Sequence, residues 1–306
     1  MPPRNVFVIG SANIDLVTRV PRCPKPGESL IGSSFATITG GKGANQAVAA
    51  ARLGARVTFA GCVGADAFGQ MQRDALAAEG IGLDHLKTTP EAPTGTAIIT
   101  VGDDGQNSIV VTPGANYALH PRDIAALAPA LRAADALLLQ LEVPLDTTAA
   151  ALRLAREAGT LTILDAGPAQ ALPAELIALA DIISPNETEA HALTGVEVTD
   201  LASAERAAQR LLELGARAVV LKLGARGALL HTSNTTHHAA PFTVTPVDTT
   251  AAGDAFTAAL ALRWGTAPAA EVLRFANAVG ALATTRHGAQ PAMPTHDEVE
   301  RFLNVQ

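Results

Sequence analysis

Aromatic side chains are scarce in this 306-residue chain, which holds eight Phe, one Trp and one Tyr. Proteins that bind single-stranded nucleic acids stack bases on aromatic rings, and so few rings do not make such a platform. Basic residues are also outnumbered, since 22 Lys and Arg oppose 29 Asp and Glu for a formal net charge of −7. Because no basic cluster in the sequence would attract phosphate backbones, we expect no nucleic acid partner.

Cysteines and long apolar runs are scarce as well. Cys23 and Cys62 are isolated in the sequence, so they form neither a disulfide framework nor a zinc ligand set. A membrane-spanning helix needs about 20 apolar residues, whereas the most apolar stretches are the shorter segments 134–141 and 255–262. Residues 1–5 lead directly into a strand-like segment, without the apolar core of a signal peptide. We therefore expect a cytoplasmic protein that does not associate with membranes.

The chain has the composition of a folded protein, with 48% hydrophobic and 17% charged residues. Its length fits about two domains or one large α/β unit. Short β-rich segments alternate with segments rich in Ala and Leu. We expect strands at 57–63, 136–141, 161–165, 181–184 and 218–223, and helices at 68–79, 147–158, 202–214, 253–264 and 269–285. This alternation predicts parallel strands joined by crossover helices, hence an α/β sheet covered on both faces.

Two regions interrupt this alternation. Residues 28–39 and 94–112 are typical of strands with no helix between them. In the second region the pattern predicts a hairpin with strands at 97–101 and 108–111 and a turn at 102–105. The two regions would form a small accessory sheet, which could serve as a lid, as a dimer surface or as an ordinary extension of the main sheet.

Two glycine-containing segments near the N-terminus are candidate ligand sites. Residues 40–45 (GGKGAN) precede a helical segment, so they combine close backbone approach with the free N–H groups of a helix start. A simple turn that caps the helix is equally consistent with this pattern. Asn13 and Asp15 follow the first strand, and in an extended chain both side chains lie on one face. An amide beside a carboxylate suits vicinal hydroxyls, although an Asx turn would use the same residues.

A third candidate lies in residues 247–256 (VDTTAAGDAF), where small residues lead directly into a helix. Successive N–H groups at this point would form an anion hole for a phosphoryl group. Asp254 falls in the first helical turn, where the helix dipole favours its ionised form. It could accept the proton of an attacking hydroxyl, and Asp248 could bind a cation. The alternative is an ordinary acidic residue at a helix start.

Two later segments follow strands and carry weaker signals. In residues 184–189 (SPNETE), Asn186 and Glu189 are three apart, so on a helix they share a face near a nucleotide phosphate or its Mg²⁺. A helix-capping segment is the commoner explanation of that spacing. Residues 222–227 (KLGARG) could let a nucleotide lie across the backbone, or they could form a β-turn between two strands.

Together and in this order, these motifs resemble the ribokinase branch of the PfkB carbohydrate kinase family. The resemblance extends from Gly10 to the C-terminal helices, and the segments 40–50 and 248–254 match the two family signatures. It implies a three-layer sandwich in which helices flank a central, mainly parallel sheet. It also implies a single domain over 1–306, with a small β-sheet lid contributed by about 14–40 and 94–113. In ribokinases the lids of two subunits clasp each other, which implies a homodimer.

The resemblance also assigns site residues at the matching positions. The sugar hydroxyls would be held by Asn13, Asp15, Gly41, Lys42, Asn45, Glu142 and Asp254. Asp254 would be the base, and Ala251, Ala252 and Gly253 would supply the N–H groups of the anion hole. The ATP site would be lined by Asn186, Lys222, Gly224, Arg226, Gly227, Gly253 and Asn277, with Glu189 positioning Mg²⁺ through water.

Ribokinases also use a monovalent cation beside the anion hole. Its matching positions are Asp248, Thr250, Ala283, Arg286, Gly288 and Ala292, with Arg286 contributing its backbone carbonyl. Ala292 stands where a serine is often found, so a hydroxyl ligand is lost and K⁺ activation is expected from a weakened or hydrated site. Asn277 stands where a His can occur beside the adenine, so nucleotide affinity is expected to differ.

The resemblance implies ATP-dependent phosphorylation of D-ribose at O5. In a loose transition state the proton leaves late, so Asp254 needs no raised pKa to act as the base. Two alternatives remain open on the residues alone. One is another kinase of the same family, acting on a nucleoside, deoxyribose or fructose. The other is a catalytically silent sugar-binding protein, because fold does not fix function.

Overall fold

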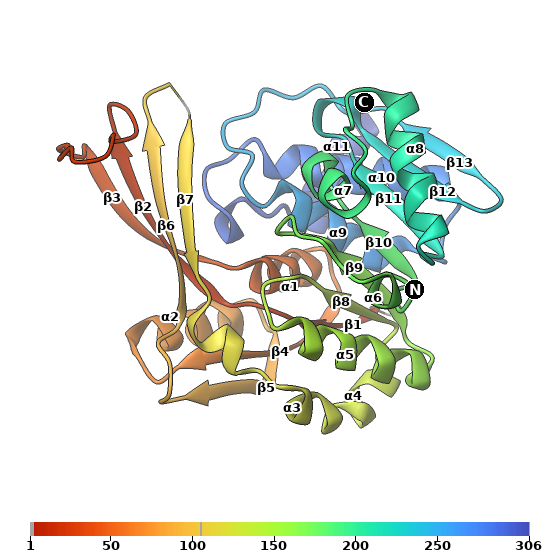
Figure 1. The fold of residues 1–306 in the computed structure, drawn as a ribbon, viewed down its shortest axis with the longest axis horizontal. Coiled ribbons are helices and arrows are strands. Elements are labelled where there is room, and N and C mark those ends of the chain that lie inside the picture. The colour runs from red at the N-terminus through yellow and green to blue at the C-terminus, as the bar shows by residue number, and fades with distance from the viewer. Residues whose placement is uncertain (1–2, 105, 306) are drawn as a thin grey trace.

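The computed structural model describes residues 3–104 and 106–305, in which the strands form two sheets (Figure 1). Gly105, part of the predicted turn at 102–105, lies outside the described residues, as do Met1 and Pro2 of the predicted N-terminal segment. The large sheet contains, in spatial order, β13 (Thr236–Ala239), β12 (Ala228–Thr232), β11 (Ala218–Lys222), β10 (Ile182–Ser184), β9 (Leu161–Asp165), β8 (Ala136–Leu139), β1 (Asn5–Ile9), β4 (Arg56–Gly64) and β5 (Gly82–Thr89). From β11 across to β5 in this spatial order, all neighbouring strands pair in parallel. Strands β12 and β13 continue the sheet as antiparallel neighbours. The mainly parallel α/β sheet is therefore confirmed.

Helices cover both faces of the large sheet and bury an apolar core on each. On one side lie α1 (Lys42–Arg52), α2 (Ala67–Ala78), α9 (Ala252–Arg263), α10 (Ala269–Ala283) and α11 (His296–Val305). On the other lie α3 (Pro121–Ala125), α4 (Ala128–Arg132), α5 (Leu145–Ala158), α6 (Ala174–Ile177), α7 (Glu187–Thr194) and α8 (Leu201–Glu213). In β1, Val6 and Val8 pack into the first core while Phe7 and Ile9 pack into the second. This alternation of period two is why a central strand must be apolar throughout.

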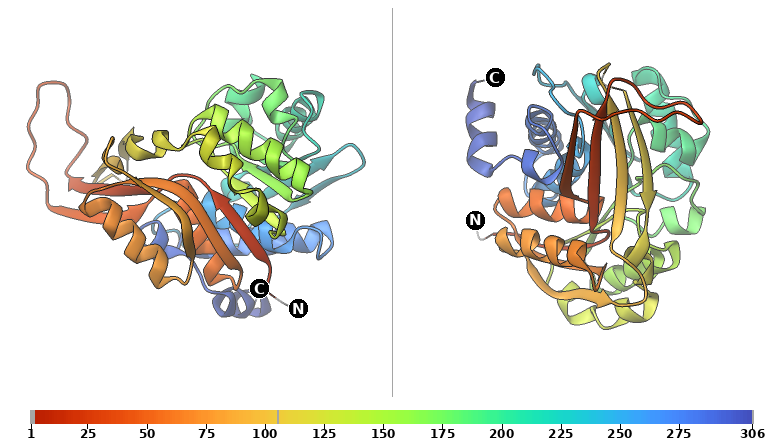
Figure 2. Two further views of the ribbon diagram at one scale, coloured as in Figure 1. Left: turned by 90° about the horizontal axis from the view of Figure 1, so that it is seen from below. Right: turned by 90° about the vertical axis from the view of Figure 1, so that its left-hand side faces the viewer.

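The small sheet consists of β3 (Ser34–Gly40), β2 (Asn13–Val20), β6 (Gly95–Gly102) and β7 (Asn107–Thr112), in that spatial order, and it stands beside the main body (Figure 1). Strands β2 and β6 pair in parallel, whereas β3 and β7 pair antiparallel to them. The predicted hairpin is thus confirmed. The predicted strand at 28–39 is wrong in its first half, because residues 21–33 form a loop that extends away from the body (Figure 2).

The ends of several other elements differ from the prediction by one or two residues. Strand β8 ends at Leu139, two residues early, because the Leu141 N–H donates to the Gly167 carbonyl rather than continuing the ladder. Helix α10 ends at Ala283, and the Thr284 N–H bonds over a tighter turn to Ala281 O. Such terminal shifts reflect local hydrogen bonding that apolar periodicity does not encode. None of the helices in residues 3–104 and 106–305 is long and apolar enough to cross a membrane.

Candidate active site

The predicted site residues converge on one edge of the large sheet, where its parallel strands end. Asn13, Glu142 and Asn186 lie in the segments that follow β1, β8 and β10 respectively, and Lys222 is the last residue of β11. The helices α1 and α9 begin at the same edge with Lys42 and Ala252. Ligands of open α/β sheets collect at this edge, outside the carboxyl ends of the strands.

Asn13 and Asp15 lie on one face of β2, as the period of two predicts. Both are nearly buried, and Asn13 Oδ1 accepts a 2.6 Å hydrogen bond from Asn116 Nδ2. A side chain at Gly40 would collide with the Asp15 carboxylate, so this glycine is required by close approach. Burial, together with the charges of Glu142 and Asp254, raises the pKa of Asp15 to about 7.

Glu142 is held by the two glycine-containing loops. Its Oε2 accepts from Ser11 Oγ at 2.5 Å and from the Lys42 N–H at 3.0 Å. Ser11 Oγ in turn accepts from the Gly43 N–H at 3.2 Å. A Cβ on Gly43 would lie 2.6 Å from Ser11 N, so only glycine lets α1 approach this loop. Ser11 carried no sequence signal of its own, and the structure makes it the residue that orients Glu142.

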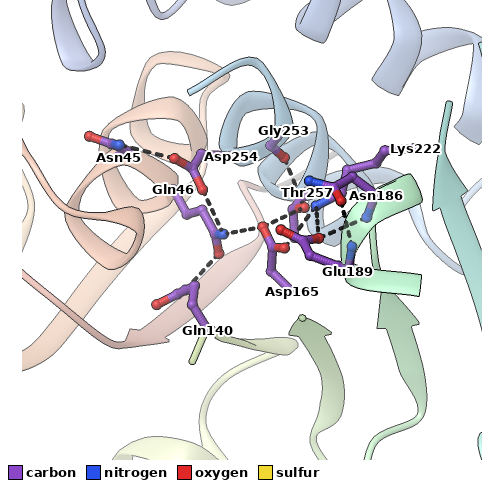
Figure 3. A network of polar contacts seen from close by, with 10 residues as sticks. All are labelled: Asn45, Gln46, Gln140, Asp165, Asn186, Glu189, Lys222, Gly253, Asp254 and Thr257. Atoms are coloured by element: carbon purple, nitrogen blue, oxygen red, sulfur yellow. Dashed lines mark hydrogen bonds and ion pairs between the residues drawn. The ribbon is translucent and has the colours of Figure 1, made fainter. Parts of the chain in front are cut away.

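Asp254 is buried in the first turn of α9 and is bound by two amides of α1 (Figure 3). Asn45 Nδ2 donates to its Oδ2 at 3.0 Å, and Gln46 Nε2 donates to its Oδ1 at 3.2 Å. Burial raises the pKa of Asp254 to about 6, while Lys42 opposes that rise and Asp165 adds to it. Asn45 Oδ1 is buried with no partner among the described residues, so it is an acceptor that a ligand hydroxyl could satisfy.

Gln46 connects Asp254 to a second buried carboxylate, Asp165 at the end of β9 (Figure 3). The same Gln46 Nε2 donates to Asp165 Oδ2 at 2.9 Å, and Gln140 Nε2 donates to Gln46 Oε1 at 2.6 Å. Asp165 Oδ1 also forms a 2.7 Å ion pair with Lys222 Nζ. Sequence reasoning gave no role to Gln46, Gln140 or Asp165. Gln46 falls inside the family signature at 40–50, but nothing local marks any of the three as a partner of a buried carboxylate.

A cavity of about 630 Å³ opens beside Asp254. Predicted nucleotide residues line it: Asn186, Glu189, Lys222, Gly224, Gly227, Gly253 and Asn277. Lys42 and Asp254 line it too, so the lysine expected to hold sugar hydroxyls faces the nucleotide side as well. Burial opposes the charged form of Lys42, but the surrounding carboxylates outweigh it and hold its pKa above the ordinary value.

Two residues expected at the nucleotide site have other partners in the structure. Arg226 does not line the cavity, because its guanidinium pairs with Glu187 at 2.7 Å and bonds the Thr199 carbonyl. Asn277 Nδ2 donates to the carbonyls of Ala239 and Ala240.

Asn186 and Glu189 form the capping box of α7, in which each side chain accepts from the other's N–H. The capping interpretation therefore holds locally, while both residues still line the cavity.

The segment before α9 presents backbone N–H groups to the same cavity. Ala251, the N-cap residue, has a φ of 60°, in the left-handed region that L side chains rarely adopt. The N–H groups of Ala251, Gly253 and Asp254 donate to no backbone carbonyl in residues 3–104 and 106–305, whereas that of Ala252 reaches Thr249 O at 3.3 Å. Oriented N–H groups at a helix start are suited to bind an anion.

Some of the residues expected to hold a monovalent cation are hydrogen-bonded to one another. Asp248 accepts from the Thr250 N–H at 3.0 Å and from the Gly288 N–H at 2.9 Å. Burial opposes its ionisation, but these hydrogen bonds outweigh burial and lower the pKa of Asp248. The Arg286 side chain pairs with Glu298. Ala283 ends α10 and Ala292 lies in η3 (Gln290–Ala292), both buried. In the described ranges no group of three or more His, Cys, Asp and Glu side chains is arranged to hold a metal ion.

Fold and site together are those of an α/β phosphotransferase, with the buried carboxylate of Asp254 between the polar side chains of β2 and a nucleotide-sized cavity. The chain belongs to the pfkB family of carbohydrate kinases, whose family model matches residues 3–296.

Named relatives match over nearly the whole chain. The ribokinase of Haemophilus influenzae is 42% identical over 301 residues, which cover 98% of each chain. The ribokinase of Staphylococcus aureus is 38% identical over 299 residues, covering 97% of this chain and 98% of the relative. The structure of Arabidopsis thaliana ribokinase complexed with ribose and ATP matches with a TM-score of 0.90 and 36% identity, covering 99% of both chains.

Proposed function

We propose that this protein transfers the γ-phosphoryl group of ATP to O5 of D-ribose, giving D-ribose 5-phosphate and ADP. The observation that carries the proposal is the position of Asp254. It lines the nucleotide-sized cavity, and its carboxylate is bound by Asn45, whose own Oδ1 is buried and unpartnered among the described residues. The relatives named ribokinase, one of them solved with ribose and ATP, support the choice of substrates.

Ribose would lie between β2 and the start of α1. Asn13, Asp15 and Glu142 would bind its hydroxyls, together with the backbone at Gly41. Asn45 Oδ1 would accept a further hydroxyl proton, satisfying an atom that is otherwise buried without a partner. This arrangement leaves O5 beside Asp254, where general-base catalysis requires the proton and the base to be within hydrogen-bond reach.

ATP would occupy the cavity, with its terminal phosphate at the start of α9. As O5 attacks, the new O5–P bond forms, the bond from phosphorus to the ADP oxygen breaks, and Asp254 takes the hydroxyl proton. The free N–H groups at Gly253 and Asp254 would stabilise charge on the phosphoryl oxygens, while Lys42 and Lys222 add positive charge at the same wall.

We further propose Mg²⁺ and K⁺ as cofactors. Mg²⁺ usually keeps several waters and is bound by one or two carboxylates together with substrate phosphates. Glu187 and Glu189 of α7 both line the cavity, and Glu187 is already paired with Arg226. K⁺ would lie near Asp248, whose pKa is lowered and which therefore stays ionised. The methyl side chain of Ala292 offers no oxygen ligand, so we expect K⁺ to activate weakly.

The small sheet is proposed as a lid over ribose and as the surface of a homodimer in the cytoplasm. Its register places Leu16, Ile98 and Val110 on one face, opposite the face that carries Asn13 and Asp15. The side chains of Phe35, Ile98 and Val110 are 64%, 52% and 60% exposed. An apolar face of this kind on a soluble protein is typical of an interface.

The first experiment measures ADP formation from Mg·ATP and D-ribose in KCl, against a control without sugar. We expect ribose-dependent turnover at about 1–100 s⁻¹, the ordinary kinase range. 2-Deoxyribose, fructose and nucleosides are tested in parallel. No turnover with ribose by folded, ATP-binding protein would reject the ribose assignment. Turnover of another sugar would then identify a different kinase of the family, and no turnover at all would favour a silent binder.

A further inference from the structure

The side chain of Asn116, in η1 (Gly114–Ala118) just after the small sheet, has its amide orientation fixed by the backbone. Its Oδ1 accepts from the Ala12 N–H at 2.9 Å, and its Nδ2 donates to the Pro113 carbonyl at 2.9 Å. A backbone N–H can only donate and a carbonyl can only accept. Asn116 is almost fully buried, so its oxygen and nitrogen cannot exchange places without leaving both groups unpaired.

This fixed amide determines which atom Asn13 presents to the site. The second N–H of Asn116 Nδ2 points at Asn13 and binds its Oδ1 at 2.6 Å. The Asn13 Nδ2 group must then lie on the other side, and it donates to no residue among 3–104 and 106–305. The cluster is tightly packed, because a Cβ added to Gly95 would collide with both amides and with the Pro113 carbonyl. The Asn13 amide is therefore held in this orientation by hydrogen bonding, because reversing it would set its Nδ2 donor against the Nδ2 donor of Asn116.

We propose that Asn116 is a specificity-determining positioning residue, which makes Asn13 present a hydrogen-bond donor beside the acceptor Asp15. The proposal rests on the proposed function and identifies which hydrogen bonds of a sugar hydroxyl its sugar site recognises. Along a strand, residues two apart are separated by roughly 7 Å on one face, a span that a sugar hydroxyl or a vicinal pair can bridge. A hydroxyl bound here accepts from Asn13 and donates to Asp15. An acceptor at Asn13 would instead compete with Asp15 for hydroxyl protons.

Deoxy and deoxyfluoro sugars test whether Asn13 presents a hydrogen-bond donor to the sugar. Fluorine can accept a weak hydrogen bond but cannot donate one, whereas hydrogen does neither. The probes are 2-deoxy- and 3-deoxy-D-ribose with the matching 2-deoxy-2-fluoro and 3-deoxy-3-fluoro sugars. For each ring position we measure the fluoro-to-deoxy ratio in kcat/KM with Mg·ATP, and in Kd by calorimetry without ATP. The native protein is expected to prefer the fluoro sugar at one of the two positions.

Asn116→Asp reverses the direction of the contact. A carboxylate only accepts, so Asn13 must turn its Nδ2 toward it and its Oδ1 toward the sugar. We expect the fluoro preference to disappear and KM for ribose to rise about tenfold, with a smaller change in kcat. Comparing the fluoro-to-deoxy ratio of the native protein with that of Asn116→Asp cancels the effect of fluorine on the reactivity of the sugar, because this effect is the same in both. A purely structural role for Asn116 would weaken both analogues equally and would leave their ratio unchanged.

Asn13→Asp provides a second test if Asn116→Asp fails to fold. It keeps an oxygen for Asn116 to donate to and replaces Nδ2 with an acceptor, so it should also abolish the fluoro preference. Asn234→Asp, at an exposed turn, controls for the added charge.

The proposal is overturned if the native protein shows no fluoro preference at either position, or if both variants keep the native ratio. If the Kd ratios behave as expected but ribose gives no turnover, the proposed function fails while the assignment of the amide stands.

Discussion

At the residue scale, the proposed chemistry depends on carboxylates that the fold has taken out of water. Asp254, Asp165 and Asp15 are all nearly or fully buried, and Asp254 and Asp165 share one amide donor, Gln46. Unpaired buried charge is costly, and here Lys222 and Lys42 supply the compensating charge. The sequence predicted that Asp254, as the base, needs no raised pKa. Burial raises it, which brings the base nearer to the working pH.

Replacing the proposed base tests its role directly. Asp254→Asn should keep KM for ribose and ATP within about threefold and lower kcat by about 10²–10⁴-fold, the usual contribution of general acid–base catalysis. Steady-state kinetics with both substrates measure the change. Asp297→Asn is the matched control, since Asp297 lies exposed in the first turn of α11. A kcat within about tenfold of native, or 1.4 kcal/mol, would contradict the assignment.

The protonation of Asp15 should make sugar binding depend on pH. Its pKa is raised to about 7 by burial and by its acidic neighbours. Only the ionised carboxylate is a pure acceptor, so KM for ribose should fall as the pH rises from 6 to 8. The ionised fraction of such a group grows about tenfold over this range, which sets the largest expected change. In Asp15→Asn, KM should be higher and independent of pH, and a native profile without slope would refute the assignment.

At the element scale, helix α1 connects the part of the site around Glu142 with the part around Asp254. Its first turn carries the Lys42 N–H that binds Glu142, and its next residues, Asn45 and Gln46, bind Asp254. The helix can approach the loop after β1 only because Gly43 has no side chain. The GGKGAN motif predicted a ligand-binding helix start, and the structure adds that this start also orients the proposed base.

Gln46 should influence the base through its shared hydrogen bonds. Gln46→Leu removes a donor from both Asp254 and Asp165, so each carboxylate is less stabilised in its ionised form. The acid limb of the kcat profile, which follows Asp254, should move to higher pH, and kcat at pH 6 should fall more than kcat at pH 8. Gln70→Leu, on the exposed surface of α2, is the control. A limb that stays at the native pH would mean that Gln46 is only structural.

Gly43 should tolerate no side chain. In Gly43→Ala the new Cβ would meet Ser11 N at 2.6 Å, so α1 must shift away from the loop. Forcing extra atoms into a packed site costs about 1–3 kcal/mol, and thermal unfolding should show a lower Tm. Gly82→Ala, where the nearest atom is an ordinary 3.5 Å away, should leave Tm nearly unchanged. Equal melting temperatures for the two variants would contradict this account.

At the scale of the whole molecule, the small sheet stands apart from the two packed cores (Figure 2). One face carries Asn13 and Asp15 of β2, the proposed sugar-binding side chains, and the other exposes the apolar residues Phe35, Ile98 and Val110. A lid that must close over a ligand is drawn from such weakly anchored elements. A second copy of the chain that covers its outer face would hold it in place.

The outer face should therefore control the oligomeric state. Ile98→Glu combined with Val110→Glu would place two charges in the proposed interface, and sedimentation should then show monomers where the native protein forms dimers. Substituting Met71, an apolar residue of α2 that is 40% exposed, by Glu gives the control. A native protein that sediments as a monomer at micromolar concentration would reject the homodimer.

The sequence by itself determined the layered α/β architecture, because apolar periodicity and turn chemistry act over a few residues. Strand β1 and the hairpin of β6 and β7 follow from such local patterns. The order of the glycine-containing motifs likewise identified the family and the candidate base Asp254. In contrast, the loop over 21–33 was missed in part, since nothing local distinguishes an exposed strand from an extended loop.

Only the tertiary structure decided which side chains of the site are hydrogen-bonded to one another. Asn45 binds Asp254 across 209 residues, and Gln46 binds Asp165 across 119. Such partners are brought together by packing, so no local spacing reveals them. The same holds for Arg226, whose guanidinium turns to Glu187 instead of the cavity. It holds too for Asn116, which fixes the Asn13 amide. Which atom faces a ligand depends on every neighbour within hydrogen-bond reach, and those neighbours come from all parts of the chain.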